Sequence, residues 1–188
     1  MSFPELYRAE SLKAIESIDT DLVWRAIELL AAARDAGRRI FVCGNGGSAS
    51  SASHFVTELL KSASMGRDKR FRIFALNDSV SSITAYSNDF DFACVFEEQL
   101  RNHAEPGDVV IAISGSGNSP NVVRALECAN AMGCVTMAFT GRDGGRLAPL
   151  AQFPIVVAHP HMGHIEDAHM VVLHIIAYYF MEEEHRHR

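Results

Sequence analysis

Short apolar runs that alternate with helix-like segments constrain the fold of this chain most strongly. Five runs are rich in Val, Ile, Phe and Ala and show little polar alternation: residues 39–43, 71–76, 108–114, 134–140 and 153–158. Such runs are typical of strands buried on both faces, as in parallel sheets. Helical spacing of apolar residues covers the segments around them: residues 3–17, 20–36, 48–64, 79–86, 92–104, 120–132 and 164–183.

This order of strands and helices predicts an α/β fold. Parallel strands joined by helices require right-handed crossovers, which place helices on both faces of the sheet. We therefore expect a three-layer α/β/α sandwich with a five-stranded parallel sheet and an N-terminal helical extension. All 188 residues are expected to form one domain, in which the helices of residues 1–37 pack on the core.

Composition and charge exclude several classes of protein. The apolar runs are far shorter than the ~20 residues that cross a bilayer, and the first residues do not resemble a secretory signal. A net charge of −6 without a basic stripe argues against nucleic-acid binding. The four cysteines form no CxxC pair, so we expect reduced, buried thiols in a cytoplasmic protein. The polar residues 184–188 are expected to form a frayed tail without a role.

Two glycine- and serine-rich loops each follow a predicted strand. The first, GNGGSAS, covers residues 44–50, and ligands of open α/β sheets bind at the carboxyl ends of strands. Glycines let backbone N–H groups approach an anion, and a helix N-terminus favours negative charge. The loop matches neither GxGxxG nor the nucleotide-binding GxxxxGK[ST] pattern. Its alternative interpretation is a tight turn in which Ser48 caps the following helix.

The second loop, SGSGNS over residues 114–119, precedes Pro120. Pro120 fits the first position of a helix, which makes Ser119 a plausible N-cap. Two such loops at one sheet edge predict a site for a phosphate monoester. The segment of residues 87–90 could bring short polar side chains to the same crevice, or could simply be an Asx turn.

Histidines and carboxylates at helical spacing suggest a metal site. His54 and Glu58 lie four residues apart, so they share a helix face, although such a pair alone is most often a surface contact. Glu166 and His174 stand in an apolar helix and lie about 80° apart on its surface. Buried ionisable groups need a partner, and a set of two histidines and two carboxylates suits zinc, although other divalent metals also fit. His169 points about 140° away from His174, so we interpret it as a hydrogen-bonded core histidine.

The motifs CGNGGSASSASHF, NDF, ISGSGNS, TGRDGG and IEDAHMVVLH resemble, in order and spacing, the phosphoheptose isomerases of the sugar-isomerase (SIS) domain superfamily. The resemblance covers residues 6–182. It implies a flavodoxin-like SIS fold and a homotetramer with sites at subunit interfaces, to which the N-terminal helices contribute. It also implies one zinc ion per subunit and conversion of D-sedoheptulose 7-phosphate to D-glycero-D-manno-heptose 7-phosphate, the first step toward ADP-heptose.

The resemblance assigns roles to residues by position. It implies phosphate binding by four serines: Ser48, Ser114, Ser116 and Ser119. It implies that the sugar contacts Asn45, Gly46, Gly47, Asn88, Asp89 and Gly115. It implies zinc ligation by His54, Glu58, Glu166 and His174, with Glu58 and Glu166 also contacting substrate. Glu58 is expected to be the base in an enediol mechanism, and His174 to move protons on the sugar oxygens.

This chain departs from the family pattern at three positions. Glu166 stands where glutamine is usual, Gly115 where threonine is usual, and Gly163 where an acidic residue is common. Two alternatives therefore stay open: an isomerase of another phosphosugar, or a non-catalytic phosphosugar-binding regulator. The presence of Glu58 and His174 speaks against the regulator.

Overall fold

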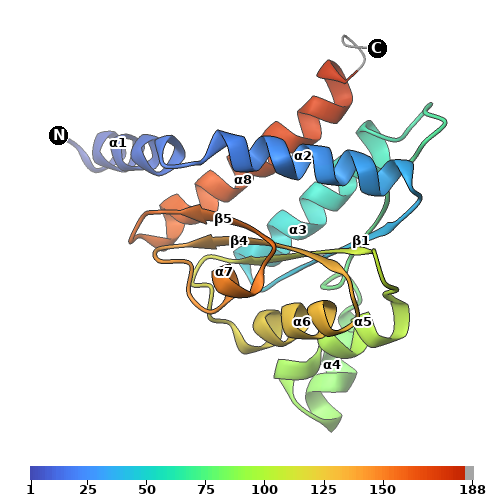
Figure 1. Cartoon of the computed structure of the whole chain (residues 1–188). Helices are drawn as coiled ribbons and strands as arrows, with labels where there is room; N and C mark the ends of the chain where they lie inside the picture. Colours follow the sequence, from blue (N-terminus) through green and yellow to red (C-terminus); the bar gives the residue numbers. More distant parts are fainter. Residues whose placement is uncertain (185–188) are drawn as a thin grey trace.

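The five apolar runs form one parallel sheet in the computed structural model, which describes residues 1–184 (Figure 1). The strands are β1 (Arg39–Gly44), β2 (Arg72–Ala75), β3 (Val109–Ser114), β4 (Val135–Gly141) and β5 (Phe153–Val157). Their spatial order is β2-β1-β3-β4-β5, and each neighbouring pair is parallel. The predicted α/β fold with a five-stranded parallel sheet is confirmed.

Helices cover both faces of this sheet, which explains why its strands are apolar on both sides (Figure 1). One face carries α2 (Thr20–Asp35), α3 (Gly47–Thr57) and α8 (Met162–Tyr178). The other carries α4 (Val80–Asp89), α5 (Glu97–His103), α6 (Pro120–Ala131) and α7 (Leu147–Leu150). Successive side chains of β1 alternate between the two cores: Ile40 and Val42 pack on the first face, Phe41 and Cys43 on the second.

The N-terminal helix α1 (Phe3–Glu16) lies against α8 and buries only Ala14. Polar contacts fasten it there, since Tyr7 Oη donates to Asp167 at 3.0 Å and Ser11 Oγ lies 2.8 Å from His164 Nδ1. The helix thus forms the predicted extension.

Several element boundaries differ from those predicted. The helix after β1 continues beyond Thr57 as a π-helical turn, η1 (Glu58–Ser62), and α8 likewise ends in η3 (Tyr179–Glu183). The helix expected over residues 92–104 is instead a short 3₁₀ turn, η2 (Phe92–Cys94), followed by α5. The side chain of Asp91 accepts from Ala93 N and caps the start of this 3₁₀ turn. No helix within residues 1–184 is long and apolar enough to cross a membrane.

The four cysteines are all buried and unpaired, as predicted. Burial raises the pKa of the Cys43 thiol to about 12 and that of Cys134 to about 11. Both thiols are therefore protonated at neutral pH, and neither is an activated nucleophile.

A buried ion pair holds the end of the chain to α2. Arg34 donates two hydrogen bonds of 2.7 Å to Glu184, and the two side chains are 5% and 8% exposed. The rings of Phe71 and Phe180 flank the guanidinium, with centroids 5.3 and 5.5 Å away. The predicted frayed tail is therefore wrong at Glu184, because this carboxylate has a buried partner. Residues 185–188 lie outside the described part of the chain.

Replacing Arg34 by methionine leaves the Glu184 carboxylate without its buried partner. We expect the variant to lose about 3–5 kcal/mol of unfolding free energy, measured by urea denaturation. The double variant Arg34→Met/Glu184→Met removes both charges and is expected to recover most of this loss. A single variant as stable as the unmodified protein would contradict this role of the pair.

Candidate functional site

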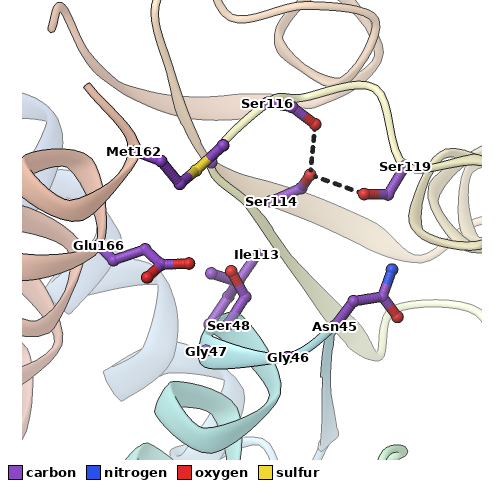
Figure 2. A pocket seen from close by; sticks show the side chains of 11 residues that line it. Asn45, Gly46, Gly47, Ser48, Ile113, Ser114, Ser116, Ser119, Met162 and Glu166 are labelled. Carbon is purple, nitrogen blue, oxygen red and sulfur yellow. Dashed lines mark hydrogen bonds between the residues drawn. The ribbon is translucent and has the colours of Figure 1, made fainter. Parts of the chain in front are cut away.

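A pocket opens at the carboxyl ends of β1 and β3, where the two loops meet (Figure 2). Its volume is ≈ 260 Å³, just below the range of about 300–1,000 Å³ typical of small-molecule sites. Its lining comprises Asn45, Gly46, Gly47, Ser48, Ile113, Ser114, Gly115, Ser116, Ser119, Met162 and Glu166. The pocket therefore suits a small polar ligand.

The first loop turns into α3 through a backbone conformation that favours glycine. Gly46 is the N-cap of α3, with φ +53° and ψ −120°, and Gly47 is the first helical residue. Ser48 consequently lies inside the first turn, buried and lining the pocket, so the interpretation of Ser48 as N-cap is wrong. A Cβ on Gly47 would lie 2.9 Å from Glu166 Oε1. The glycine thus lets the carboxylate approach the positive end of α3.

The second loop gathers three hydroxyl groups. Ser114 Oγ lies 3.4 Å from Ser116 Oγ and 3.2 Å from Ser119 Oγ, and Figure 2 shows all three on the same wall of the pocket. Ser119 is the N-cap of α6 and Pro120 follows it, as predicted, but its side chain makes no capping hydrogen bond. Its hydroxyl therefore stays with the other serines, so the loop presents neutral donors beside a helix N-terminus.

A reciprocal amide pair joins the two loops. Asn45 Nδ2 donates to Asn121 Oδ1 at 2.8 Å, and Asn121 Nδ2 donates to Asn45 Oδ1 at 2.9 Å. Asn121 is only 1% exposed, and its Oδ1 also accepts from Val122 N at 3.0 Å. The pair fixes the amide of Asn45 at the rim of the pocket and sets the spacing of the loops.

Two of the four expected metal ligands meet in this chain. His54 Nε2, on α3, lies 2.8 Å from His174 Nε2, on α8. Glu58 stands one turn beyond His54 at the start of η1, and Glu166 lines the pocket eight residues before His174. Within residues 1–184, no group of three or more His, Cys, Asp or Glu side chains converges closely enough to hold a metal. Two facing imidazole nitrogens fit the donor preference of zinc. Glu58 stands on η1, directly after the helix of His54, and Glu166 stands on the helix of His174.

His169 has the structural role predicted for it. Its Nε2 lies 3.0 Å from the carbonyl oxygen of Thr140, and the residue is 1% exposed. Burial lowers the pKa of this imidazole, so it is neutral at pH 7 and donates from Nε2. The hydrogen bond fastens α8 to the end of β4.

Three further residues expected at the site do not line the pocket of a single chain. Asn88 and Asp89 lie exposed in the last turn of α4, where Asn88 Nδ2 donates to Asp89 Oδ1 at 2.8 Å. The Asx turn expected there is absent, because the helix continues through Asp89 and the side chain that caps the next turn is Asp91. Glu58 is half-buried on η1.

Sequence reasoning missed three residues that shape the pocket. Ile113 directly precedes the serine loop in β3, so its place in the lining could have been inferred. Met162 and Asn121 gave no such signal, because only the packed structure brings Met162 over the serine loop and Asn121 against Asn45.

The described lining of the pocket contains no lysine or arginine. Glu166 is the one ionisable side chain in its described lining, and the remaining polar groups are hydroxyls, an amide and backbone. A phosphate bound here would depend on neutral hydrogen bonds and on the N-termini of α3 and α6.

Comparisons with known proteins agree with this geometry. The SIS domain family matches residues 7–141. A phosphoheptose isomerase of Citrifermentans bemidjiense is 39% identical over 167 residues, which cover 89% of this chain and 86% of the relative. The phosphoheptose isomerase of Mycobacterium tuberculosis is 43% identical over 154 residues, covering 81% and 78%. The structure of a phosphoheptose isomerase from Neisseria gonorrhoeae superposes with a TM-score of 0.84 at 34% identity, covering 94% of this chain and 95% of that one.

Replacing Ser114 by alanine removes the hydroxyl at the centre of the serine cluster. We expect inorganic phosphate to bind about 10-fold more weakly, because one hydrogen bond to a charged group is lost. Isothermal titration calorimetry measures the effect, with Ser81→Ala on the exposed surface of α4 as the matched control. Equal phosphate affinity in both variants would show that the phosphate does not bind at this cluster.

Proposed function

We propose that this chain, which belongs to the phosphoheptose isomerase family, interconverts D-sedoheptulose 7-phosphate and D-glycero-D-manno-heptose 7-phosphate. The observation that carries the proposal is the convergence of the serine loop, the α3 N-terminus and Glu166 on one pocket, with the His54–His174 pair on the same two helices. This reaction is the first step toward ADP-heptose. We place it in the cytoplasm, since four buried, unpaired thiols suit a reducing compartment.

The phosphate end of the substrate binds in a group of hydroxyls that we call the serine cradle: those of Ser48, Ser114, Ser116 and Ser119. Backbone N–H groups at the starts of α3 and α6 also donate to the phosphate. Asn45, Gly46, Gly47 and Gly115 line the rest of the pocket and contact the sugar carbons and hydroxyls. A ligand fixed at its phosphate presents its other end toward α8.

The reaction needs one proton to move between neighbouring carbons. Glu58 removes the proton from the carbon next to the carbonyl, which gives an enediol, and the proton is returned to the adjacent carbon. His174 carries the proton that passes between the two sugar oxygens. Atoms balance without an oxidant, since the aldose and the ketose are isomers.

We propose that a homotetramer completes the site. Glu58, Asn88 and Asp89 lie outside the pocket of the single chain, so their access to substrate depends on a neighbouring subunit. Large apolar side chains are exposed on α1 and around α4, as at a surface that another subunit covers: Phe3, Leu6, Leu12, Val80, Phe90 and Phe92. The contribution of the N-terminal helices to this interface follows from their exposed apolar residues.

We also propose one zinc ion per subunit, held by His54, Glu58, Glu166 and His174. When bound, a zinc ion at these residues would supply Lewis-acid polarisation of the sugar carbonyl. The facing imidazoles support this site. Glu58 is assigned two roles, zinc ligand and base. A carboxylate that binds the ion tightly is not free to accept a proton, so one role dominates in each state of the reaction.

Replacing Glu58 by glutamine removes the proposed base and retains the size of the side chain. We expect turnover of sedoheptulose 7-phosphate to fall by about 10²–10⁴-fold, with the fold and the phosphate affinity unchanged. The matched control is Glu16→Gln on the exposed end of α1. Full activity of Glu58→Gln would refute the assignment.

Removal of zinc is expected to abolish turnover and to lower the melting temperature, because a bound ion stabilises the folded state. Dialysis against a chelator, followed by zinc titration calorimetry, measures the stoichiometry and the recovery. His54→Ala and His174→Ala should both lose high-affinity zinc binding, whereas His103→Ala, an exposed histidine at the end of α5, should not. High-affinity zinc binding that survives in both ligand variants would place the ion elsewhere.

A further inference from the structure

Met162 stands at the start of α8 and reaches over the pocket. It is the first residue of the helix, after the extended N-cap His161, and it precedes Glu166 by one turn. Figure 2 shows its thioether between Glu166 and the wall that carries Ser114 and Ser116. The side chain is therefore beside any ligand that runs from the serine cradle toward α8.

Gly115 faces this thioether without a side chain of its own. A Cβ on Gly115 would lie 2.4 Å from Met162 Sδ and 3.6 Å from Met162 Cε. Gly115 does not adopt a positive φ, so its backbone conformation does not require glycine. A side chain at position 115 would instead displace the flexible Met162 thioether, which occupies that volume.

The chemistry of Met162 contrasts with the rest of the pocket. The lining presents hydroxyls, an amide, a carboxylate and backbone, and its apolar side chains are Met162 and Ile113. A thioether is flexible and polarisable, so it contacts carbon–hydrogen surface closely and does not hydrogen-bond strongly. Its position suits the middle carbons of a phosphosugar, between the phosphate and the reacting end.

We propose that Met162 is a specificity-determining residue, whose thioether, seated against Gly115, sets the width of the pocket and holds the carbon chain of a seven-carbon ketose phosphate. The proposal deepens the proposed function and rests on it for the identity of the substrate. Gly115 and Met162 act as a pair: the missing side chain of one makes room for the other.

Three variants test whether Gly115 and Met162 act together: Gly115→Ala, Met162→Ala and the double variant. Isothermal titration calorimetry measures the affinity of each variant for sedoheptulose 7-phosphate and for inorganic phosphate. We expect Gly115→Ala to weaken sugar-phosphate binding about 10-fold, because its Cβ drives the thioether into the pocket. The double variant should bind more tightly than Gly115→Ala, and inorganic phosphate should bind all three proteins as it binds the unmodified one.

The same experiment can overturn the proposal in two ways. A double variant as weak as Gly115→Ala would show that the glycine acts independently of Met162. An equal loss of phosphate and sugar-phosphate affinity in Gly115→Ala would show damage to the serine cradle and no effect on specificity.

A turnover assay tests specificity itself. The ratio of kcat/KM for sedoheptulose 7-phosphate to that for a 2-ketohexose 6-phosphate should fall about 10-fold in Met162→Ala. Met162→Leu, which conserves volume, should retain the ratio, and an unchanged ratio in Met162→Ala would contradict the proposal. A protein that binds both sugars without converting either would refute the proposed function, whereas the calorimetric comparison would still test the Gly115–Met162 pair.

Discussion

The parallel pairing of β1 with β3 is the constraint on which the site depends. In this register Gly44 lies opposite Ile113, so both strands end at the same edge of the sheet and their loops emerge side by side. The Asn45–Asn121 amide pair then locks one loop to the start of the other helix. A slip of the register would separate Ser48 from Ser114 and would leave two ordinary turns. The meeting of the two serine-containing loops is thus a consequence of the strand pairing.

The second requirement is the placement of α8. This helix carries Met162 and Glu166 into the pocket and His174 to His54, all from one rigid element. Its apolar face packs on the sheet through Ile165, Ala168 and Val172, and the His169–Thr140 hydrogen bond fixes it at the end of β4. Groups held on packed helices keep their positions more accurately than groups on mobile loops. The ionisable residues of α8 therefore have different surroundings. His164 and Asp167 contact α1, and His169 contacts β4. Glu166 lines the pocket, and His174 meets His54.

Much of the fold follows from local sequence, and the site follows in part. Strands buried on both faces are apolar throughout, so the positions of β1, β3 and β4 could be predicted from their apolar runs. The two loops could be predicted from the glycines and serines that follow these runs. The break between η2 and α5 could not be predicted, because the helical spacing of apolar residues continues through it. Met162 and Asn121 acquire their roles from contacts between distant segments, which periodicity does not report. Glu58, Asn88 and Asp89 stand outside the pocket of one chain, and a single sequence does not reveal what a neighbouring subunit supplies.

The central claim is that a neutral phosphate cradle and an acid–base pair on α3/η1 and α8 act on one sugar. The most direct measurement is proton NMR of sedoheptulose 7-phosphate incubated with the zinc-loaded protein in D₂O. We expect the signals of the aldose to grow with time, with solvent deuterium at C2, the carbon that carried the ketose carbonyl. A substrate that stays unchanged and unlabelled while calorimetry shows it bound would contradict the claim.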